Sequence, residues 1–327
     1  MPRLLALGRA YAGYLRGAVR LPGLPHRFWI EPTNTCNFQC VMCPNSMEEV
    51  KRAEKGDMEW SLYTRIIDEI GGSPRDVNLF HRGESLVHPR FVEMIAYAHE
   101  RGLKTRLHTN ASLLDPKTAE ETIRAGLDYV SFSFDGYDKP SYESARIKGK
   151  FETTIRNIVS FLEAKKRLGR GRPFAVLQVM EIGAGNGDLP ARREAFRKRF
   201  EGLPLDRFTV RTPHNWGGTL DVAGKGVRED LYTVCTFPWY SMTILWDGRV
   251  LPCPQDFKAE MVLGDLTRQT VAEVWNSPET VALRTKLRDR DLGGLPLCAG
   301  CDILHRKTFL GVPSDYLKTF IADQLVR

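Results

Sequence analysis

The stretch Cys36-Asn37-Phe38-Gln39-Cys40-Val41-Met42-Cys43, shortly after the apolar run Phe28-Trp29-Ile30, decides how the whole chain is interpreted. Its three thiols have the spacing C-x3-C-x2-C, and thiols so close in sequence can converge on one metal centre. A structural zinc or iron-sulfur site takes four protein ligands, whereas a site that performs chemistry keeps one position for a small molecule. The stretch therefore predicts a catalytic metal centre with an open position. An incomplete zinc site and a set of buried thiols are the alternatives.

The same spacing resembles the signature of the radical S-adenosylmethionine (SAM) superfamily. The resemblance implies that Cys36, Cys40 and Cys43 hold a [4Fe-4S] cluster whose fourth iron is chelated by the amino and carboxylate groups of SAM. In that family one electron from the cluster cleaves SAM, and the 5′-deoxyadenosyl radical that results abstracts hydrogen from the substrate. Met42 departs from the family pattern, in which the residue before the third Cys is usually aromatic.

Length and composition narrow the class of protein. The chain has 327 residues, 42% of them hydrophobic, which is enough for one large barrel or two domains. Seven Cys without a secretory signal indicate metal or redox chemistry in a reducing compartment, so we expect a cytoplasmic protein. The net charge is +7, but Lys and Arg are interspersed with Asp and Glu, which favours solvated faces over a nucleic-acid partner. A basic surface would suit an acidic electron donor such as a flavodoxin or a ferredoxin.

Residues 1–27 read as a basic amphipathic extension, in which Leu and Tyr side chains alternate with Arg. Its apolar run is too short and too often interrupted by Arg for a signal sequence or a transmembrane segment. We expect a helix that packs on the barrel, with contact to a membrane surface as the alternative.

From Phe28 to Pro213, short β-branched or aromatic runs alternate with longer segments of helical period, the pattern of repeated βα units around parallel strands. We expect strands near 28–32, 77–81, 104–109, 129–134, 174–180 and 208–212, and helices near 60–70, 89–101, 116–125, 151–167 and 188–200. The resemblance implies an α/β fold, a partial (β/α)6 TIM barrel, and we assign this radical SAM core to residues 28–225.

Polar motifs follow the predicted strands in the order in which the family has them. Functional groups of βα barrels gather at the C-terminal ends of the strands. The loop His81-Arg82-Gly83-Glu84 resembles the family's Gly-Gly-Glu-Pro motif, which contacts the amino group of SAM, although Arg82 departs from it. The SAM-binding residues that the resemblance implies are Gly83, Glu84, Asn110, Ser133 and Arg146, the last as the partner of the SAM carboxylate. Taken singly, a Ser or Asn at a strand end is an ordinary turn or cap residue.

The sixth strand ends in the polar, glycine-rich segment Arg211-Thr212-Pro213-His214-Asn215-Trp216-Gly217-Gly218. Arg211 and His214 are our candidates for residues that face the substrate and assist catalysis, with ordinary loop structure as the alternative. Gln178 on the fifth strand is a further candidate for an inward-pointing side chain.

The other four Cys lie beyond the barrel, at Cys235, Cys253, Cys298 and Cys301. Asp247-Gly248 between two apolar runs predicts a hairpin that brings Cys235 and Cys253 together, and short helices are expected at 271–277 and 278–289. This part resembles the SPASM/Twitch extension of radical SAM enzymes, a small α+β Cys-rich domain that we assign to residues 226–327. The resemblance implies that the four thiols hold an auxiliary [4Fe-4S] cluster; a structural zinc is the alternative.

These assignments predict an enzyme with two [4Fe-4S] clusters and SAM as cofactors. A fully ligated auxiliary cluster suits electron transfer, and the seven Cys divide into three and four without a spare thiol. The layout is similar to Twitch alcohol dehydrogenases, so we expect oxidation of a secondary alcohol in a sugar-like or aminocyclitol-type small molecule. The alternatives are oxidation, crosslinking or epimerisation of a peptide or protein, which the short segment before Cys36 makes less favoured, and a non-catalytic iron-sulfur electron carrier.

Overall fold

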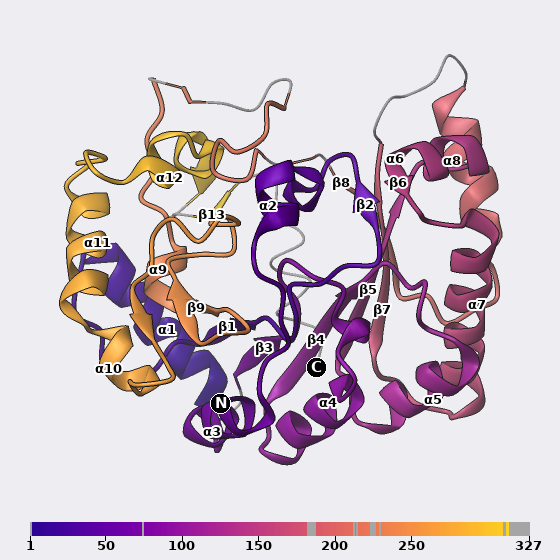
Figure 1. Ribbon diagram of the computed structural model, residues 1–327, viewed down its shortest axis with the longest axis horizontal. Helices are drawn as coiled ribbons and strands as arrows, with labels where there is room; N and C mark the ends of the chain where they lie inside the picture. Colours follow the sequence, from indigo (N-terminus) through magenta and orange to yellow (C-terminus); the bar gives the residue numbers. More distant parts are fainter. Residues whose placement is uncertain are drawn as a thin grey trace. The chain divides into compact units, whose positions relative to one another are not determined.

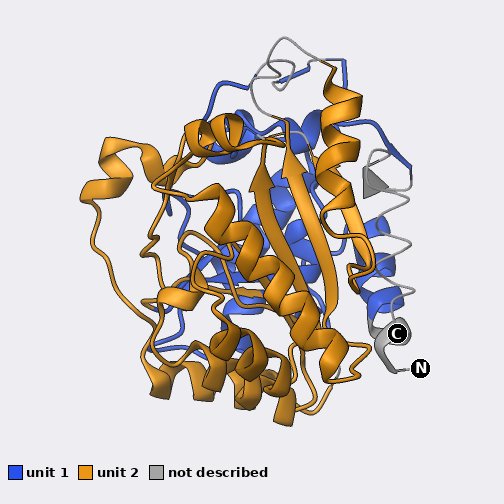
Figure 2. Cartoon of the chain, turned by 90° about the vertical axis from the view of Figure 1, so that its right-hand side faces the viewer, with its two compact units in different colours: residues 1–28, 214–244, 248–327 blue, residues 29–213, 245–247 orange. Residues whose placement is uncertain are grey.

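The computed structural model describes residues 2–73, 75–181, 188–211, 213, 215–222, 227–228, 230–309 and 312–313. The chain divides into two compact units (Figure 2). The barrel unit comprises residues 29–213 and 245–247, and the auxiliary unit comprises residues 1–28, 214–244 and 248–327. The division into domains at 1–27, 28–225 and 226–327 stays a prediction.

Six strands follow one another across the barrel sheet in the order of the chain: β1 (Arg27–Ile30), β3 (Asp76–Asn78), β4 (Lys104–Thr109), β5 (Tyr129–Asp135), β7 (Phe174–Met180) and β8 (Arg207–Arg211). The pairs from β3 to β8 are all parallel. All six predicted strands are confirmed, with ends that differ by a few residues, as strand boundaries commonly do. The sheet is therefore the parallel sheet of a partial βα barrel.

Helices connect these strands, as the helical periods predict: α3 (Trp60–Ile70), α4 (Phe91–Glu100), α5 (Pro116–Arg124), α7 (Phe151–Arg167) and α8 (Leu189–Lys198). Two of them begin at an Asp that caps the helix, since Asp115 accepts from Thr118 N and Asp188 from Ala191 N, with Pro in the first turn. Short helices α2 (Glu48–Arg52) and α6 (Lys139–Ala145) lie in the connections. Figure 1 shows α4, α5 and α7 on one side of the sheet.

The side of the sheet that faces the helices is apolar. Phe132 packs on Phe161 of α7 with ring centroids 5.2 Å apart, and Phe134 packs on Phe151 at 5.6 Å. Leu107 is also completely buried. Because side chains alternate along a strand, the residues between these positions point to the opposite side, the inner face of the barrel. The inner face is where polar side chains can meet a substrate.

The auxiliary unit contains an antiparallel sheet of β9 (Ser241–Ile244), β10 (Arg249–Leu251) and β11 (Gly264–Asp265). The expected hairpin is confirmed by the pairing of β9 with β10, in which Val250 is opposite Ile244. The two expected helices are present as α10 (Val271–Trp275) and α11 (Pro278–Arg288), followed by the short α12 (Pro296–Ala299). Thr270 and Glu273 form a capping box at the start of α10. A small two-stranded sheet pairs β12 (Thr308–Phe309) with β13 (Val312–Pro313).

The N-terminal helix α1 (Pro2–Leu15) packs within the auxiliary unit, on α9 (Phe237–Tyr240). Tyr14 donates a hydrogen bond to Val234 O at 2.8 Å. The rings of Tyr14 and Trp239 pack edge to face, with their centroids 5.8 Å apart. Trp239 in turn donates to Ala18 O at 2.7 Å. The expectation that this helix packs on the barrel is therefore wrong, because its aromatic side chains find partners around Trp239. None of the described helices is long and apolar enough to cross a membrane.

Candidate active site

The three thiols of the cluster loop lie close to one another. A charge on Cys40 would shift the pKa of both Cys36 and Cys43, and burial raises the pKa of Cys36 to about 11 and that of Cys43 to about 12. The loop is held by the pairing of β2 (Gln39–Cys40) with β6 (Arg146–Ile147), in which Cys40 is opposite Arg146. The thiols are therefore protonated until a metal binds, and metal binding would release their protons.

This donor set fits a four-iron cluster. The described residues include no group of three or more His, Cys, Asp or Glu side chains arranged around a single metal ion. In a four-iron cluster each thiolate binds a different iron, so its ligands stand farther apart than those of one ion. Cys36, Cys40 and Cys43 would hold such a cluster and leave its fourth iron without a ligand from this loop.

Charged side chains surround the cluster loop. Arg146 is only 5% exposed, and its Nε lies 2.7 Å from a carboxylate oxygen of Asp135, at the end of β5. Burial lowers the pKa of Arg146, but the charges of Asp135 and Cys40 outweigh this and raise it. The arrangement brings a guanidinium that cannot lose its charge to the side of Cys40. The role of Arg146 as partner of the SAM carboxylate stays a prediction.

Glu84 locks the loops that follow β3 and β4. Its buried carboxylate accepts hydrogen bonds from Thr109 Oγ1 at 2.8 Å, from Asn110 N at 2.7 Å and from Leu86 N at 3.3 Å. Burial raises its pKa, which these hydrogen bonds only partly offset. Beside it, a Cβ on Gly83 would lie 2.3 Å from Thr33 O, so only glycine fits this position. A direct contact of Gly83 or Glu84 with SAM stays a prediction.

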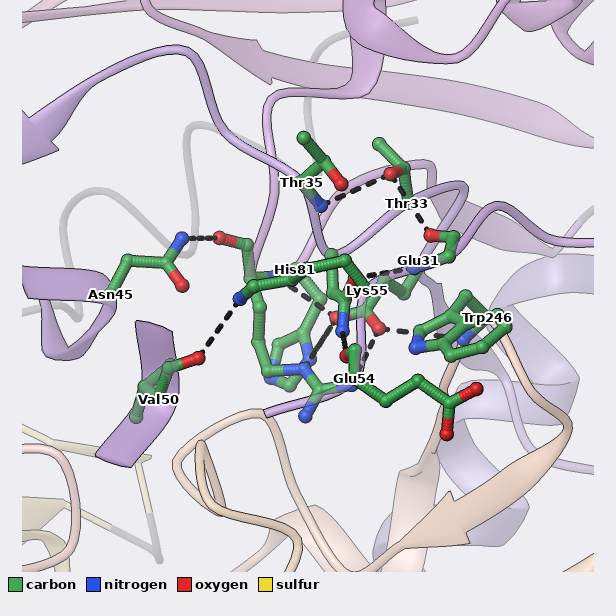
Figure 3. A network of polar contacts seen from close by, with 12 residues as sticks. Glu31, Thr33, Thr35, Asn45, Val50, Glu54, Lys55, His81 and Trp246 are labelled. Atoms are coloured by element: carbon green, nitrogen blue, oxygen red, sulfur yellow. Dashed lines mark hydrogen bonds and ion pairs between the residues drawn. The ribbon is translucent and has the colours of Figure 1, made fainter. Parts of the chain in front are cut away.

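Glu31, which the sequence analysis did not single out, organises the same region (Figure 3). Its fully buried carboxylate accepts from Arg82 Nε at 2.8 Å and Nη2 at 2.7 Å, and lies 3.2 Å from His81 Nδ1. Trp246 N donates to it at 3.4 Å. Burial acts to raise the pKa of Glu31, but the hydrogen bonds of Arg82 and His81 outweigh it and lower the pKa to about 2. The sequence held one sign of this pair: Arg82 stands where the family motif has a glycine, and an arginine at a buried position favours an acidic partner.

Asn110 ties the end of β4 to the cluster loop. Its amide Nδ2 donates to Asn37 Oδ1 at 2.9 Å, and Asn37 Nδ2 donates to Ser112 Oγ at 2.8 Å. Asn37 stands between the first two Cys and was not predicted as a site residue. Ser133 is half-buried on the inner face of β5, in register with Gln178 of β7. The predicted SAM-site residues therefore gather around the cluster loop and along the neighbouring strand ends.

Of the two catalytic candidates, the structure describes Arg211 but not His214. Arg211 is the last residue of β8 and is in register with Met180, which is in register with Asp135 of β5. Its charge reaches into the inner face, since it helps to lower the pKa of His108 on β4. His214 lies outside the described residues. The catalytic roles of both stay predictions.

The four thiols of the auxiliary unit also lie close together. Cys253 and Cys301 are 8% and 7% exposed, and charges on Cys235, Cys298 and Cys301 would all act on Cys253. Burial, followed by the nearby thiols, raises the pKa of Cys235 above its usual range. Cys301 N donates to Cys298 O at 3.2 Å, which closes the C-x2-C turn. Four converging thiols fit an iron-sulfur cluster that takes all its ligands from the protein.

Two family models match the chain. Residues 30–170 match the radical SAM superfamily, and residues 235–302 match the SPASM iron-sulfur cluster-binding domain. Each match contains one of the two groups of Cys described above. The assignment of individual thiols as cluster ligands stays a prediction.

Proteins of known sequence agree with these matches. A PqqA peptide cyclase of Granulibacter bethesdensis is 35% identical over 83% of this chain and 78% of its own length. The SAM-dependent 2-deoxy-scyllo-inosamine dehydrogenase of Niallia circulans is 21% identical over 85% of this chain and 93% of its own length. A tungsten-containing aldehyde ferredoxin oxidoreductase cofactor-modifying protein of Pyrococcus furiosus is 24% identical over 69% of this chain and 70% of its own length.

Solved structures share the fold. BtrN in complex with AdoMet and 2-DOIA aligns with a TM-score of 0.59 and 19% identity, over 85% of this chain and 93% of that one. SuiB of Streptococcus suis bound to its precursor peptide SuiA aligns with a TM-score of 0.63 and 15% identity, over 86% of this chain and 71% of that one. The chain belongs to the radical SAM superfamily: it is a radical SAM enzyme with a SPASM domain, and its cofactors are SAM and iron-sulfur clusters.

Proposed function

We propose that this enzyme oxidises a secondary alcohol of a sugar-like or aminocyclitol-type metabolite to a ketone. The observation that carries the proposal is the division of the seven Cys into a group of three and a group of four. Returning a hydrogen atom from a thiol to a substrate radical, as an epimerisation requires, would need a further Cys. A dehydrogenation needs only an acceptor for one electron.

The reaction removes two protons and two electrons from the substrate. When bound, SAM and the first cluster supply the radical that accepts a hydrogen atom, and the auxiliary cluster supplies an acceptor for one electron. The carbinol carbon loses the hydrogen atom, the hydroxyl oxygen loses a proton, and the C–O single bond becomes C=O.

The chain's own residues position the alcohol and take its proton. Arg211 ends β8 on the inner face, where its guanidinium would stabilise a hydroxyl oxygen that is losing its proton. Gln178, in register with Ser133 and Thr209, would orient neighbouring hydroxyls by hydrogen bonds. His214, three residues after Arg211, is the proposed base. An acidic flavodoxin or ferredoxin is the proposed source of electrons for SAM cleavage.

A relative with a small-molecule substrate supports the proposal. This chain covers 93% of the 2-deoxy-scyllo-inosamine dehydrogenase. The regions that are matched in the dehydrogenase thus amount to nearly the whole of that enzyme.

The test uses anaerobically reconstituted protein with SAM, dithionite and alcohols that carry deuterium on the carbinol carbon. The panel begins with 2-deoxy-scyllo-inosamine and extends to other cyclitols and sugars. We expect a ketone and 5′-deoxyadenosine that contains one deuterium, in equal amounts. A Cys40→Ala control should form neither. Deuterium in 5′-deoxyadenosine together with an inverted alcohol, in place of the ketone, would contradict the proposal.

A second candidate is modification of a peptide. It is favoured by the 35% identity with the PqqA peptide cyclase, which exceeds the 21% identity with the dehydrogenase. Incubation with short peptides encoded beside the gene, followed by mass spectrometry, separates the two candidates. A peptide that loses two mass units per crosslink, with no ketone from any alcohol, would replace the first proposal by the second.

A further inference from the structure

The strand that carries Cys40 is one half of a two-stranded ribbon, formed by β2 and β6 (Figure 1). In this antiparallel pair Cys40 is opposite Arg146, so their side chains lie on the same face of the ribbon. Arg146 is buried on that face and pairs with Asp135 at the end of β5. The face of Cys40 therefore points into the barrel unit.

The other face of the ribbon carries apolar side chains that are in contact with solvent. Val41 N donates to Ala145 O at 3.0 Å, which extends the pairing by one residue. Because side chains alternate along a strand, Val41 and Ile147 point away from the face of Cys40. They are 52% and 41% exposed. A single layer of backbone thus lies between the thiol of Cys40 and an apolar outer surface.

A third exposed apolar side chain, Leu113, lies in the loop that follows β4 and is 38% exposed. This loop is tied to the cluster loop, residues 36–43, because Asn37 Nδ2 donates to Ser112 Oγ at 2.8 Å. It is also tied to α7, since Asn157 Nδ2 donates to Ser112 O at 3.0 Å. The three apolar side chains therefore belong to segments that are joined at the cluster loop.

Two exposed lysines, Lys148 and Lys150, stand on a turn that packs on the cluster loop. A Cβ on Gly149, between them, would lie 3.1 Å from Phe38 Cε2. Phe38 is buried in the loop between the first two Cys. The turn is closed by a hydrogen bond from Gly149 N to Arg146 O at 2.7 Å. Both lysines are therefore held beside the cluster loop.

The charge beside these apolar side chains is positive. Residues 147–156 contain three cations, Lys148, Lys150 and Arg156, against one carboxylate, Glu152. Arg156 donates to Thr153 Oγ1 at 3.1 Å, so its guanidinium lies toward the end of α7 that follows Lys150. Among the described residues, none of the three cations has a carboxylate partner. Exposed cations of this kind can meet the carboxylates of another protein.

The position of this surface favours an electron donor as its occupant. Cleavage of SAM consumes one electron at the first cluster, and a reductant outside the chain supplies it. An apolar centre with a polar rim is the usual composition of a protein interface, and cations on the rim attract an acidic partner and speed its approach. A protein that docks here brings its redox group close to the outer side of Cys40.

We propose that this surface, with Val41, Leu113 and Ile147 at its centre and Lys148, Lys150 and Arg156 at its rim, docks an acidic protein that carries a one-electron redox group. The partner loses one electron and the first cluster gains it, and no covalent bond forms or breaks in this step. The inference rests on the acidic donor of the proposed function, and it does not depend on the oxidation of an alcohol.

The first experiment measures binding of oxidised flavodoxin, an acidic redox protein, to the reconstituted holoenzyme by isothermal titration calorimetry at several ionic strengths. Lys148→Glu/Lys150→Glu reverses two rim charges, and Ile147→Ser removes an apolar side chain without a change of charge. Arg170→Glu is the matched control, because Arg170 is exposed just beyond the other end of α7. A helix of 17 residues separates it from Lys150 by about 25 Å. Iron content and the circular dichroism spectrum verify that each variant is loaded and folded.

We expect the wild-type enzyme to bind flavodoxin, and salt to weaken the binding. The double charge reversal should weaken binding about 10-fold and flatten its dependence on salt, because two attractive charges become repulsive. Ile147→Ser should weaken binding about 3-fold and leave the salt dependence unchanged, since only apolar contact is lost. The absence of binding to the wild-type enzyme, or equal weakening by Arg170→Glu, overturns the inference.

The second experiment compares two reductants in the formation of 5′-deoxyadenosine. Flavodoxin, kept reduced by NADPH and a flavodoxin reductase, needs a docking surface, whereas dithionite is a small molecule and does not. The double variant should lower the rate at limiting flavodoxin about 10-fold and leave the rate with dithionite unchanged. Equal losses with both reductants would show that these residues support the cluster loop, and equal flavodoxin rates in wild type and variant would place the donor elsewhere. Either result overturns the inference.

Two further outcomes concern other occupants and the proposed function. A dimer of the wild-type enzyme that the double variant dissociates would assign the surface to a second copy of this chain and overturn the inference. Ketone formation does not enter either measurement. If no alcohol is oxidised but SAM cleavage by flavodoxin depends on the surface, the dehydrogenation is wrong and the docking surface stands.

Discussion

The two groups of Cys have different electrostatic surroundings. In the barrel unit, three thiols lie beside the guanidinium of Arg146, whose charge opposes the effect of burial on the pKa of Cys40. In the auxiliary unit, the thiol of Cys253 is affected by burial and by three other thiols, and all of these effects raise its pKa. Three thiols next to a fixed cation can admit an anionic ligand at the open position, whereas four thiols enclose the metal centre completely. The difference accords with the roles proposed above, SAM cleavage at the first group and electron transfer at the second.

Three buried charges, two in the barrel unit and one in the auxiliary unit, have different kinds of partner. In the barrel unit, the carboxylates of Glu31 and Asp135 each have an arginine partner. In the auxiliary unit, the buried Arg284 donates to Pro238 O at 2.8 Å and to Val19 O at 2.9 Å, and stacks over Trp275. Its neighbours are carbonyl oxygens, and burial lowers its pKa to about 10. Glu31 and Asp135 are thus held by ion pairs, and Arg284 by dipoles.

The largest effect should come from breaking each group of Cys in turn. Cys40→Ala should reduce SAM cleavage to background, because the cluster that reduces SAM loses a ligand. Cys298→Ala should leave SAM cleavage in place but stop ketone formation, since the acceptor of the second electron is lost. Chromatography of 5′-deoxyadenosine and of the ketone measures SAM cleavage and product formation separately. Iron analysis should show that each variant loses about four irons per chain. Loss of SAM cleavage in Cys298→Ala with the first cluster intact would contradict the division of roles.

The next effect concerns the buried ion pair between Glu31 and Arg82. Glu31→Gln leaves the guanidinium of Arg82 buried without its carboxylate, which typically costs about 3 to 5 kcal/mol of unfolding free energy. Denaturation with urea at pH 7 measures the loss. Glu93→Gln is the control, because Glu93 forms an exposed pair with Arg90 and should change the unfolding free energy by less than about 1 kcal/mol. Equal losses in the two variants would show that the buried pair contributes no more than a surface pair.

The same variant has a defined pH dependence. Since the pKa of Glu31 is lowered to about 2 in the folded protein, its stabilising contribution is present above the pKa of the unfolded chain, about 4.3. The contribution is lost as the pH falls from there through the folded pKa. The difference in unfolding free energy between wild type and Glu31→Gln should therefore shrink between about pH 5 and pH 2. A difference that stays constant over this interval would exclude a lowered pKa.

A smaller loss is expected at the charge that has no carboxylate partner. Arg284→Leu leaves the carbonyl oxygens of Pro238 and Val19 without their donor, but it also removes a buried charge, so the two effects oppose each other. We expect a loss of about 2 kcal/mol of unfolding free energy, less than for Glu31→Gln because no opposite charge is stranded. A loss greater than that of Glu31→Gln would mean that the dipoles around Arg284 contribute more than the ion pair of Glu31.

Local patterns were enough to predict the strands, the helices and the hairpin, because the period of apolar residues and the turn residues act over short distances. The pairing of Glu31 with Arg82 was not predicted, because it depends on which strand lies beside β1 rather than on any local pattern. The prediction for the packing of α1 was wrong for the same reason, since Trp239 is remote in the sequence from Tyr14. Contacts between distant segments were thus the part that the sequence left open.

The smallest effect is expected at Ala111, which has φ of 59°. Ala111→Gly relieves backbone strain of about 1 to 2 kcal/mol, but it loses a buried methyl group and makes the unfolded chain more flexible, each about 0.5 to 1 kcal/mol. The unfolding free energy should change by less than about 1 kcal/mol. Gly248→Ala provides the contrast in the auxiliary unit, where φ is 92° and a Cβ would meet Thr267 Cγ2 at 2.9 Å. If Ala111→Gly lowers the unfolding free energy as much as Gly248→Ala does, packing of the Ala111 methyl group outweighs the backbone strain at this position.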